Sequence, residues 1–241
     1  MTFERRDTHN SNVPKIYRAC EAWHKGVCSA LTPPQLISLA KHTTRRTHES
    51  EGGLLREADP LESCVNIMKG VLELLKIAVD GRQQIVGLQF APNFPCRLLA
   101  SENSMAAEAA LDRQICGFRK SALDRLVAVN PDREHRLLYQ ILRKLDKAWE
   151  WLVTLGRKIM AKKVASFLHL IASHFDPEID GGASRFLLPL NRSDIADYLE
   201  LAFETFSLQM TRLCKAGWIE IENRRRITIP DRNRLMEEAG F

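Results

Sequence analysis

Two periodicities of apolar residues divide the chain into regions of different predicted structure. Between about residues 44 and 122, short apolar runs alternate with turn signals, and glycines recur at similar spacing. Asp80-Gly81 stands between two of these runs, which is a strong signal for a β-hairpin. Several short strands at this spacing predict a small β-sandwich or β-roll. Just before this region, the stretch "TPPQLISLAKHT" predicts a short helix that begins with a capping box.

From residue 131 onward the spacing of apolar residues becomes helical. Over residues 131–159 they recur at alternating intervals of three and four, which is the heptad pattern of a helix that packs against another helix. The members of this seam are Leu138, Ile141, Leu145, Ala148, Leu152, Leu155 and Ile159. A second stripe of Leu142, Trp149 and Val153 is expected to pack on the β-roll. We therefore expect 131–159 to be a dimerisation helix whose narrow seam faces a second copy of the chain.

The C-terminal part of the chain has the pattern of a helix-turn-helix. An amphipathic helix over "AKKVASFLHLIASHF" comes first. Asn191 is then expected to cap a short helix over "RSDIADYL", and a second helix runs from about 203 to 215 and ends at Gly217. Two short helices joined by a tight turn are typical of DNA-binding proteins, in which the second helix contacts the base pairs.

A small wing is predicted directly after these helices. The stretch "WIEIENRRRITIP" has two short runs of alternating apolar residues on either side of Asn223-Arg224, which indicates a hairpin. Arg224, Arg225 and Arg226 lie at its tip, where they are well placed to contact phosphates. An ordinary helical hairpin is the simpler interpretation of two helices alone, but the wing and the upstream dimer seam favour DNA binding.

Composition and charge agree with a globular protein that binds a polyanion. The 241 residues suffice for two domains of ordinary size, with 45% hydrophobic and 27% charged residues. We expect a cytoplasmic protein with no membrane partner, because no apolar run approaches the roughly 18 residues of a membrane span and the N-terminus does not resemble a secretory signal. A net charge of +5 mildly favours a polyanionic partner.

The motifs that would indicate an enzyme are missing from the sequence. It contains no P-loop, no dinucleotide fingerprint, no G-x-S-x-G and no HExxH, so we expect no catalytic residues. Six cysteines in a cytoplasmic chain of this size do not indicate a disulfide framework. Buried thiols and metal or redox chemistry are the two interpretations that remain.

Taken in order, these segments resemble the CRP/FNR family of transcription regulators, and within it the FnrN/FnrL type of alpha-proteobacteria. The resemblance rests on "CEAWHKGVC", "DGRQQIVGLQFAP", "AEAALDRQICGF", "EWLVTLGRK", "VASFLHLIA", "LPLNRSDIADYL" and "QMTRLCKAGWIEIEN". It implies an α+β fold with a cyclic-nucleotide-binding-like β-roll, a long dimerisation helix and a winged helix-turn-helix. The expected domains are an N-terminal cysteine-containing sensor segment (1–30), the β-roll (31–130), the dimerisation helix (131–159) and the DNA-binding domain (160–241).

The resemblance also implies a function and its partners. The expected protein is an oxygen- or redox-responsive activator that binds a palindromic double-stranded DNA site as a homodimer and contacts RNA polymerase. In the family, a Glu-x-x-Ser-Arg motif early in the recognition helix reads the DNA. Glu204 and Ser207 match this motif, whereas Leu208 stands at the arginine position and offers only apolar contact. The residues expected to contact DNA are Glu204, Thr205, Ser207, Gln209, Arg212, Arg224 and Arg226.

The turn between the two DNA-binding helices departs from the family as well. Glu200 stands where the family has a glycine, and Ala202 stands where it has a threonine cap. Each change is expected to cost about 1 kcal/mol of stability. An alternative function follows from these changes, in which the chain is a member with impaired cluster or DNA binding that acts by dimerising with other family members.

The sensor region implied by the resemblance is a [4Fe–4S] site with four cysteines. Here Cys20, Cys28 and Cys116 occupy three of the four positions, and Tyr17 replaces the first cysteine. His24 lies midway between Cys20 and Cys28 and is a possible fourth ligand. Three thiolates and one imidazole suit either an iron–sulfur cluster or Zn²⁺, so a zinc- or thiol-based sensor is a further alternative. A degraded site without a ligand is the third interpretation.

The other cysteines and the nucleotide pocket give weaker predictions. Cys64 and Cys214 are expected to be packed small hydrophobic residues, and Cys96 falls in a loop where it is expected to be oxidisable rather than a ligand. Relatives that bind cyclic nucleotides pair an arginine with a serine around the phosphate. The matching stretch "LLASENSMAAEA" lacks that arginine, so we expect no cyclic nucleotide.

Overall fold

A computed structural model describes residues 31–48, 53–60, 62–92, 101–110, 113–128, 131–175 and 182–240. These residues form two compact units, one from the residues up to 72 together with 89–142, the other from 73–88 together with 143 onward. No helix in the described ranges is long and apolar enough to cross a membrane.

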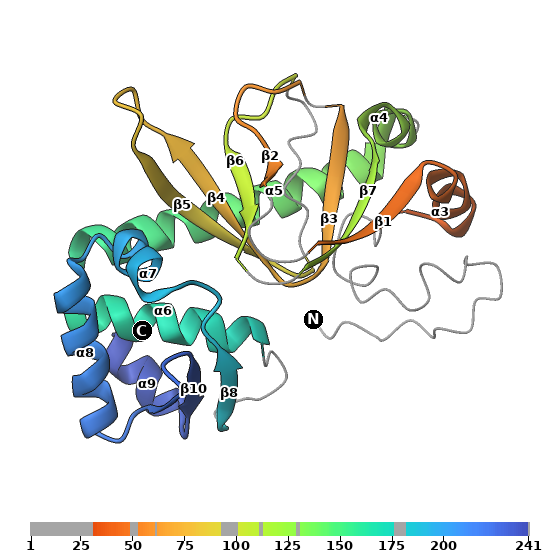
Figure 1. Cartoon of the computed structure of the whole chain (residues 1–241). Helices are drawn as coiled ribbons and strands as arrows, with labels where there is room; N and C mark the ends of the chain where they lie inside the picture. Colours follow the sequence, from red (N-terminus) through yellow and green to blue (C-terminus); the bar gives the residue numbers. More distant parts are fainter. Residues whose placement is uncertain are drawn as a thin grey trace. The chain divides into compact units, whose positions relative to one another are not determined.

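The first unit contains the β-strands that the alternating pattern predicted. One sheet has the strand order β1-β7-β3, and a second sheet has the order β2-β6-β4-β5 (Figure 1). Most of the β4–β5 hairpin, residues 73–88, is assigned to the second unit. The strands are β1 (Thr43–His48), β2 (Gly53–Leu55), β3 (Ser63–Lys69), β4 (Val71–Ile77), β5 (Gln83–Phe90), β6 (Ala106–Ala109) and β7 (Arg113–Arg119). Helices α3 (Pro33–Ala40) and α4 (Lys120–Ala128) accompany them.

Short-range signals in the sequence explain the start and the hairpin of this region. Helix α3 begins at a capping box, in which the Thr32 backbone N–H donates to Oε1 of Gln35 at 3.0 Å. Strands β4 and β5 are neighbours joined by the predicted turn, where Gly81 has φ +81° and Ala78 N donates to Arg82 O at 2.8 Å. Only a residue without a Cβ adopts this left-handed conformation cheaply, so the Asp-Gly pair fixes the hairpin.

The long helix α5 extends from Pro131 to Arg157. Its end lies two residues before the expected boundary, so Ile159 falls in the link between α5 and the next helix rather than in the seam. Leu142, Trp149 and Val153 of the second stripe are about half exposed in the structure. The pattern therefore predicted the helix, and the packing of the second stripe on the β-roll stays a prediction.

The second unit is built around helix α6 (Met160–Phe175). The predicted apolar face of α6 is buried, with Val164, Phe167, Leu168 and Ile171 inaccessible to solvent. The helices α7 (Arg192–Tyr198), α8 (Phe203–Lys215) and α9 (Arg232–Ala239) follow, together with a sheet of β8 (Ser184–Leu187), β10 (Arg226–Ile229) and β9 (Glu220–Glu222) in that order. Figure 1 shows α8 at one side of this unit, with α7 at its N-terminal end.

Candidate nucleic-acid interface

The first helix of the helix-turn-helix begins at the predicted cap. Oδ1 of Asn191 accepts a hydrogen bond from the backbone N–H of Asp194 at 2.9 Å, which satisfies one of the free donors of the first turn. Burial raises the pKa of Asp194, and the neighbouring carboxylate of Asp197 raises it further. Tyr198 at the other end stacks on Trp151 with ring centroids 4.9 Å apart. These contacts hold α7 on the core of the unit.

A tight turn joins α7 to α8. Glu200 has φ +54°, a left-handed conformation, as expected for a residue at a glycine position. The backbone N–H of Leu201 donates back to Ala196 O at 2.9 Å, and Nζ of Lys163 on α6 donates to Leu199 O at 3.2 Å. These bonds close the end of α7 and fix the direction in which α8 begins. Ala202 precedes α8 without a side-chain cap, as predicted.

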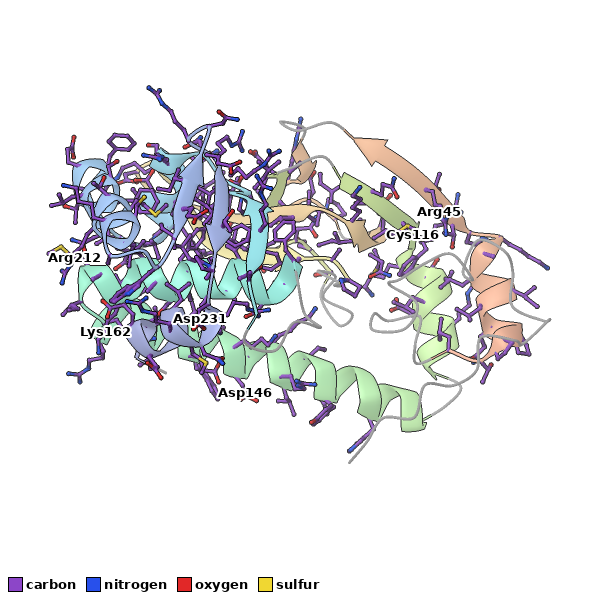
Figure 2. All side chains as sticks on the ribbon, turned by 90° about the horizontal axis from the view of Figure 1, so that it is seen from below. Arg45, Cys116, Asp146, Lys162, Arg212 and Asp231 are labelled. Carbon is purple, nitrogen blue, oxygen red and sulfur yellow. The ribbon has the colours of Figure 1, made fainter. Side chains whose placement is uncertain are left out.

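Helix α8 has one buried and one exposed face. Phe206, Met210 and Leu213 point into the core and anchor the helix. Glu204 and Arg212 are exposed on the other side, and Figure 2 shows Arg212 at the outer edge of the unit. The observed bounds of α8, Phe203–Lys215, are those expected from the sequence. The helix ends before Gly217, which has φ +71° as its predicted role in the cap requires.

The remaining residues expected on the recognition helix are less accessible. Thr205 is half-buried. Oγ of Ser207 and Oε1 of Gln209 are buried and have no hydrogen-bond partner within the structure. The two matching motif residues therefore differ, because Glu204 presents its carboxylate to solvent and Ser207 does not present its hydroxyl.

The wing turns at Asn223 and Arg224, which have φ values of +48° and +60°. Two consecutive left-handed residues are typical of a type I′ turn between two antiparallel strands, here β9 and β10. Arg224 is exposed at the tip. Glu222 forms an ion pair with Arg185 at 2.6 Å and a longer one with Arg226 at 3.9 Å. The charge of Arg226 is therefore partly neutralised by a carboxylate, whereas the guanidinium group of Arg224 extends outward.

Two contacts between the wing and its neighbours were not anticipated from the sequence. Nη2 of Arg192, in the first turn of α7, lies 3.5 Å from the Arg224 carbonyl oxygen, and Nη2 of Arg225 donates to Leu188 O at 3.3 Å. The Arg225 side chain therefore ties the wing to the backbone at Leu188, instead of projecting from the tip of the wing. Arg192 brings a further cation to the surface between α7 and the wing, and no spacing rule in the sequence would have identified it.

Comparisons with known proteins identify this arrangement. Residues 162–238 match the Crp-like helix-turn-helix domain. A probable transcriptional activator of Rhizobium leguminosarum bv. viciae is 44% identical over 98% of both chains. The transcriptional activator protein FnrL of Cereibacter sphaeroides is 32% identical, over 95% of this chain and 94% of its own. The chain belongs to the CRP/FNR family.

Its fold is also that of a solved family structure. The structure of FixK2 from Bradyrhizobium japonicum matches with a TM-score of 0.73 and 25% identity, covering 83% of this chain and 98% of that chain. These findings confirm the predicted α+β fold and the DNA-binding helix-turn-helix of a CRP/FNR transcriptional activator. They also confirm the prediction that the chain is not an enzyme, because these curated relatives are transcriptional activators and the matched domain is a helix-turn-helix.

One of the expected sensor ligands of this CRP/FNR protein lies in the described sheet. Cys116 on β7 is buried and stands directly opposite Arg45 on β1 and Asn66 on β3. Directly opposed residues of an antiparallel sheet point to the same face, with Cβ atoms about 4.5–5.5 Å apart. Figure 2 shows Arg45 and Cys116 side by side. Tyr17, Cys20, His24 and Cys28 lie outside the described residues.

Asn66 has an unusual environment. Its side chain is fully buried, and neither Nδ2 nor Oδ1 has a hydrogen-bond partner among the residues that the structure describes. An unpaired amide in a protein interior costs stability, so its position beside a buried cysteine requires an explanation. Within the described ranges, no group of three or more histidine, cysteine or acidic side chains is placed to hold a metal ion.

The remaining cysteines give mixed outcomes. Cys64 is fully buried in β3, but it is bonded in a disulfide and is not a packed thiol. Cys214 is exposed on α8, so the expectation of a packed small hydrophobic residue is wrong there. It faces outward because the core-facing positions of that helix are taken by Phe206, Met210 and Leu213. Cys96 lies outside the described residues.

Proposed function

We propose that this protein is a cytoplasmic, homodimeric CRP/FNR activator that binds a palindromic DNA site and responds to oxygen or redox state. The observation that carries the DNA-binding part is the geometry of α8 and the wing, with Glu204 exposed on the helix and Arg224 exposed at the hairpin tip. A carboxylate in the major groove accepts from the N4 amino group of cytosine. Arginines on either side contact phosphates and fix the register of the helix.

The predicted contact residues take different parts in this proposal. Arg212 and Arg224 bind phosphates, and Arg226 joins them when DNA competes with Glu222 for its guanidinium group. Thr205 lies on the same helix and is half-buried. Ser207 and Gln209 contact DNA only after a side-chain rotation, since their buried oxygens are turned away from solvent.

The homodimer is supported by the seam of α5. Leu138, Ile141, Leu145 and Leu152 are between two-fifths and two-thirds exposed in the single chain, and Leu155 is half-buried. A helix of 27 residues with such a face is typical of a two-stranded coiled coil. Two copies related by a two-fold axis would present two recognition helices to a palindromic site, and RNA polymerase is the partner implied for an activator.

The cofactor part rests on Cys116 and the amide beside it. Cys116, Cys20 and Cys28, with His24 as the possible fourth ligand, would hold a [4Fe–4S] cluster. A buried N–H group that lacks an acceptor fits this interpretation, because amide donors near ligating thiolates stabilise their negative charge. When bound, the cluster would supply an oxygen-labile redox centre. The protein's own contribution is a sheet face on which Cys116 and Asn66 are buried and the opposing Arg45 is exposed.

One observation favours a second candidate function. Glu200 adopts φ +54° without a glycine, Ala202 leaves the start of α8 uncapped, and Leu208 replaces the guanine-reading arginine. All three changes fall on the DNA-reading element, which supports an impaired member that acts by dimerising with other regulators of the family. Zn²⁺ or thiol sensing on the same scaffold is distinguished from a cluster by the metal content described below.

Salt-dependent DNA binding tests the first proposal. Binding of the full chain to a palindromic FNR-type site is measured by fluorescence anisotropy, for the native protein and for a variant with Arg224→Ala and Arg226→Ala. The variant should bind more weakly on all sequences, with the slope of log K against log salt reduced by about 2. Lys41→Ala with Arg119→Ala is the control, because both cations are exposed on the other unit. An absence of DNA binding by the native protein would favour the dimerising alternative.

Anaerobic reconstitution followed by iron, sulfide and zinc analysis tests the cofactor. Tyr17→Cys restores four thiolates, so that variant should take up about four irons per subunit and bleach in oxygen. The native chain should hold less iron. If the native chain holds a full complement that His24→Ala abolishes, His24 is the fourth ligand and the tyrosine is no defect. Bound zinc without sulfide would indicate the zinc sensor.

A further inference from the structure

Two large apolar side chains are exposed on the N-terminal half of the recognition helix. Phe203 is 48% exposed and Leu208 is 65% exposed. Neither belongs to the apolar face that anchors α8, which consists of Phe206, Met210 and Leu213. Exposed apolar area is unfavourable in water, so covering these two side chains with an apolar group would be favourable.

Their positions put them where base pairs are read. Phe203, Glu204, Ser207 and Leu208 stand at positions i, i+1, i+4 and i+5, which share one side of an α-helix. In a helix-turn-helix, the N-terminal residues of the second helix contact the base edges in the major groove. The exposed carboxylate of Glu204 therefore has one apolar side chain beside it and another one turn further along.

We propose that Phe203 and Leu208 read the 5-methyl groups of thymines, so that this protein selects T·A pairs where an arginine in place of Leu208 would select guanine. The inference rests on the proposed DNA-binding function and specifies its substrate. The thymine methyl is the one apolar group that a base pair presents in the major groove, and apolar side chains are its usual partners. Together with Glu204, which accepts from cytosine, the helix would recognise a half-site that combines thymine with cytosine.

Charge and area both favour DNA over a protein as the occupant. Arg212 and Lys215 further along α8 and Arg224 at the wing tip are exposed cations of the same unit, which suits a polyanion. A stable protein interface buries about 800 Å² on each partner, whereas these are two side chains with a carboxylate and a serine between them. Two separate apolar side chains on a unit with exposed cations match the chemistry of a major groove.

Thymine can be changed by one methyl group, which allows a direct test. Sites are first selected by the full-length native protein from a palindromic library with random half-sites, and thymine should be enriched in each half-site. Each selected thymine is then replaced by deoxyuridine, which removes the methyl and keeps the pairing. We expect binding to weaken by about fourfold for each contacted methyl, the value of one buried carbon group. Measured on the same duplexes, Leu208→Ala and Phe203→Ala should each lose the penalty at one position.

Thr211→Ala is the matched control, because Thr211 is exposed on the same helix but one turn beyond Leu208; its methyl dependence should equal that of the native protein. Sequence-specific binding that ignores the thymine-to-deoxyuridine change overturns the inference and leaves the proposed function intact. The same holds if both alanine variants retain the full penalty. A change of self-association in Leu208→Ala, with unchanged DNA binding, would make the pair a protein contact. If the native protein selects no site at all, the inference and the proposed function both fail.

Discussion

Glu200, in the turn between α7 and α8, has a left-handed backbone conformation that is sterically unfavourable for a residue with a Cβ atom. A non-glycine residue at φ +54° carries a steric cost that glycine avoids. Glu200→Gly should therefore stabilise the protein by about 0.5–1 kcal/mol, after the extra flexibility of glycine in the unfolded chain is subtracted. Thermal unfolding would show this as a higher Tm.

The control for this change is Glu200→Gln, which removes the charge but retains the left-handed backbone and should leave the Tm nearly unchanged. If Gln stabilises as much as Gly, the carboxylate and not the backbone is the source of the cost. If neither variant changes the Tm, the strain is relieved in solution by movement of the turn.

Asn66 allows a second test at the scale of one residue. Both polar atoms of its buried amide lack partners, and an unsatisfied buried group costs about 1–3 kcal/mol. Asn66→Leu, of similar size, should raise the free energy of unfolding of aerobically purified protein by a comparable amount. The same variant should lose a reconstituted cluster sooner, because the side-chain amide N–H that lies opposite Cys116 would be removed. Lower stability in urea unfolding would show that the amide is already paired in solution.

Residues with local signals were predicted correctly, and residues defined by cross-strand contacts were not. The cap at Asn191 and the left-handed Gly217 depend on neighbours within a few positions, which the sequence shows directly, whereas the left-handed Glu200 was expected from the family resemblance. The unpaired amide of Asn66 depends on β7, some fifty residues away along the chain. The contact between Arg192 and the Arg224 carbonyl spans 32 residues and is equally hidden in a linear pattern.

The same distinction holds for whole elements. The β4–β5 hairpin, α3, α6 and α8 carry periodicity and end signals within their own segments, so the sequence predicted each of them. Strand β8 is four residues long and exists because it pairs with β10, Phe186 opposite Ile227. Helix α9 was missed although Asp231 caps it by accepting from Asn233 N and Arg234 N. The aspartate at the N-cap position is a usable start signal that periodicity alone did not reveal.

Helix α6 gives a prediction about pH. Burial lowers the pKa of His169, with Arg232 and Lys158 lowering it further, and burial also lowers the pKa of His174. The two histidines therefore bind protons less readily in the folded protein than in the unfolded chain, where histidine titrates near pH 6.5. Stability should be complete above about pH 6.5 and should fall as the pH drops below it toward the folded pKa values.

The measurement is the Tm from about pH 8 to about pH 5.5. His169→Gln with His174→Gln should give a flatter curve at the acidic end, since neither glutamine binds a proton and the one at 174 can still donate to the Leu170 carbonyl that Nδ1 of His174 now contacts at 2.8 Å. His135→Gln, at an exposed position of α5, is the control and should follow the native curve. Parallel curves for the double variant and the native protein would assign the acid sensitivity to other groups.

At the scale of the whole molecule, the order of elements was enough to place the chain in its family, but not to define its signal. The helix-turn-helix and the wing lie within the described residues from Asn191 to Ile229, so the exposure and the hydrogen bonds of their side chains are known. Of the proposed cluster ligands, Cys116 alone has a described environment. Metal content in solution is therefore the decisive measurement for the proposed sensing chemistry. The proposed DNA contacts, in contrast, follow from side chains of known exposure.

Binding of a palindromic site requires a dimer, and the seam of α5 supplies its proposed interface. Ile141 and Leu152 lie in the seam of α5 and are 45% and 64% exposed in the single chain. Glutamates at both positions would place like charges in a closed apolar interface, where the cost of desolvation is several kcal/mol. Sedimentation velocity should show the native protein as a dimer at tens of micromolar and Ile141→Glu with Leu152→Glu as a folded monomer. Arg143→Glu with Arg157→Glu, which lie opposite the seam in the heptad, should remain dimeric. The monomer should also lose its preference for a palindrome over a single half-site, because one recognition helix contacts one half-site. A native protein that is already monomeric at this concentration would show that the seam does not form a dimer interface.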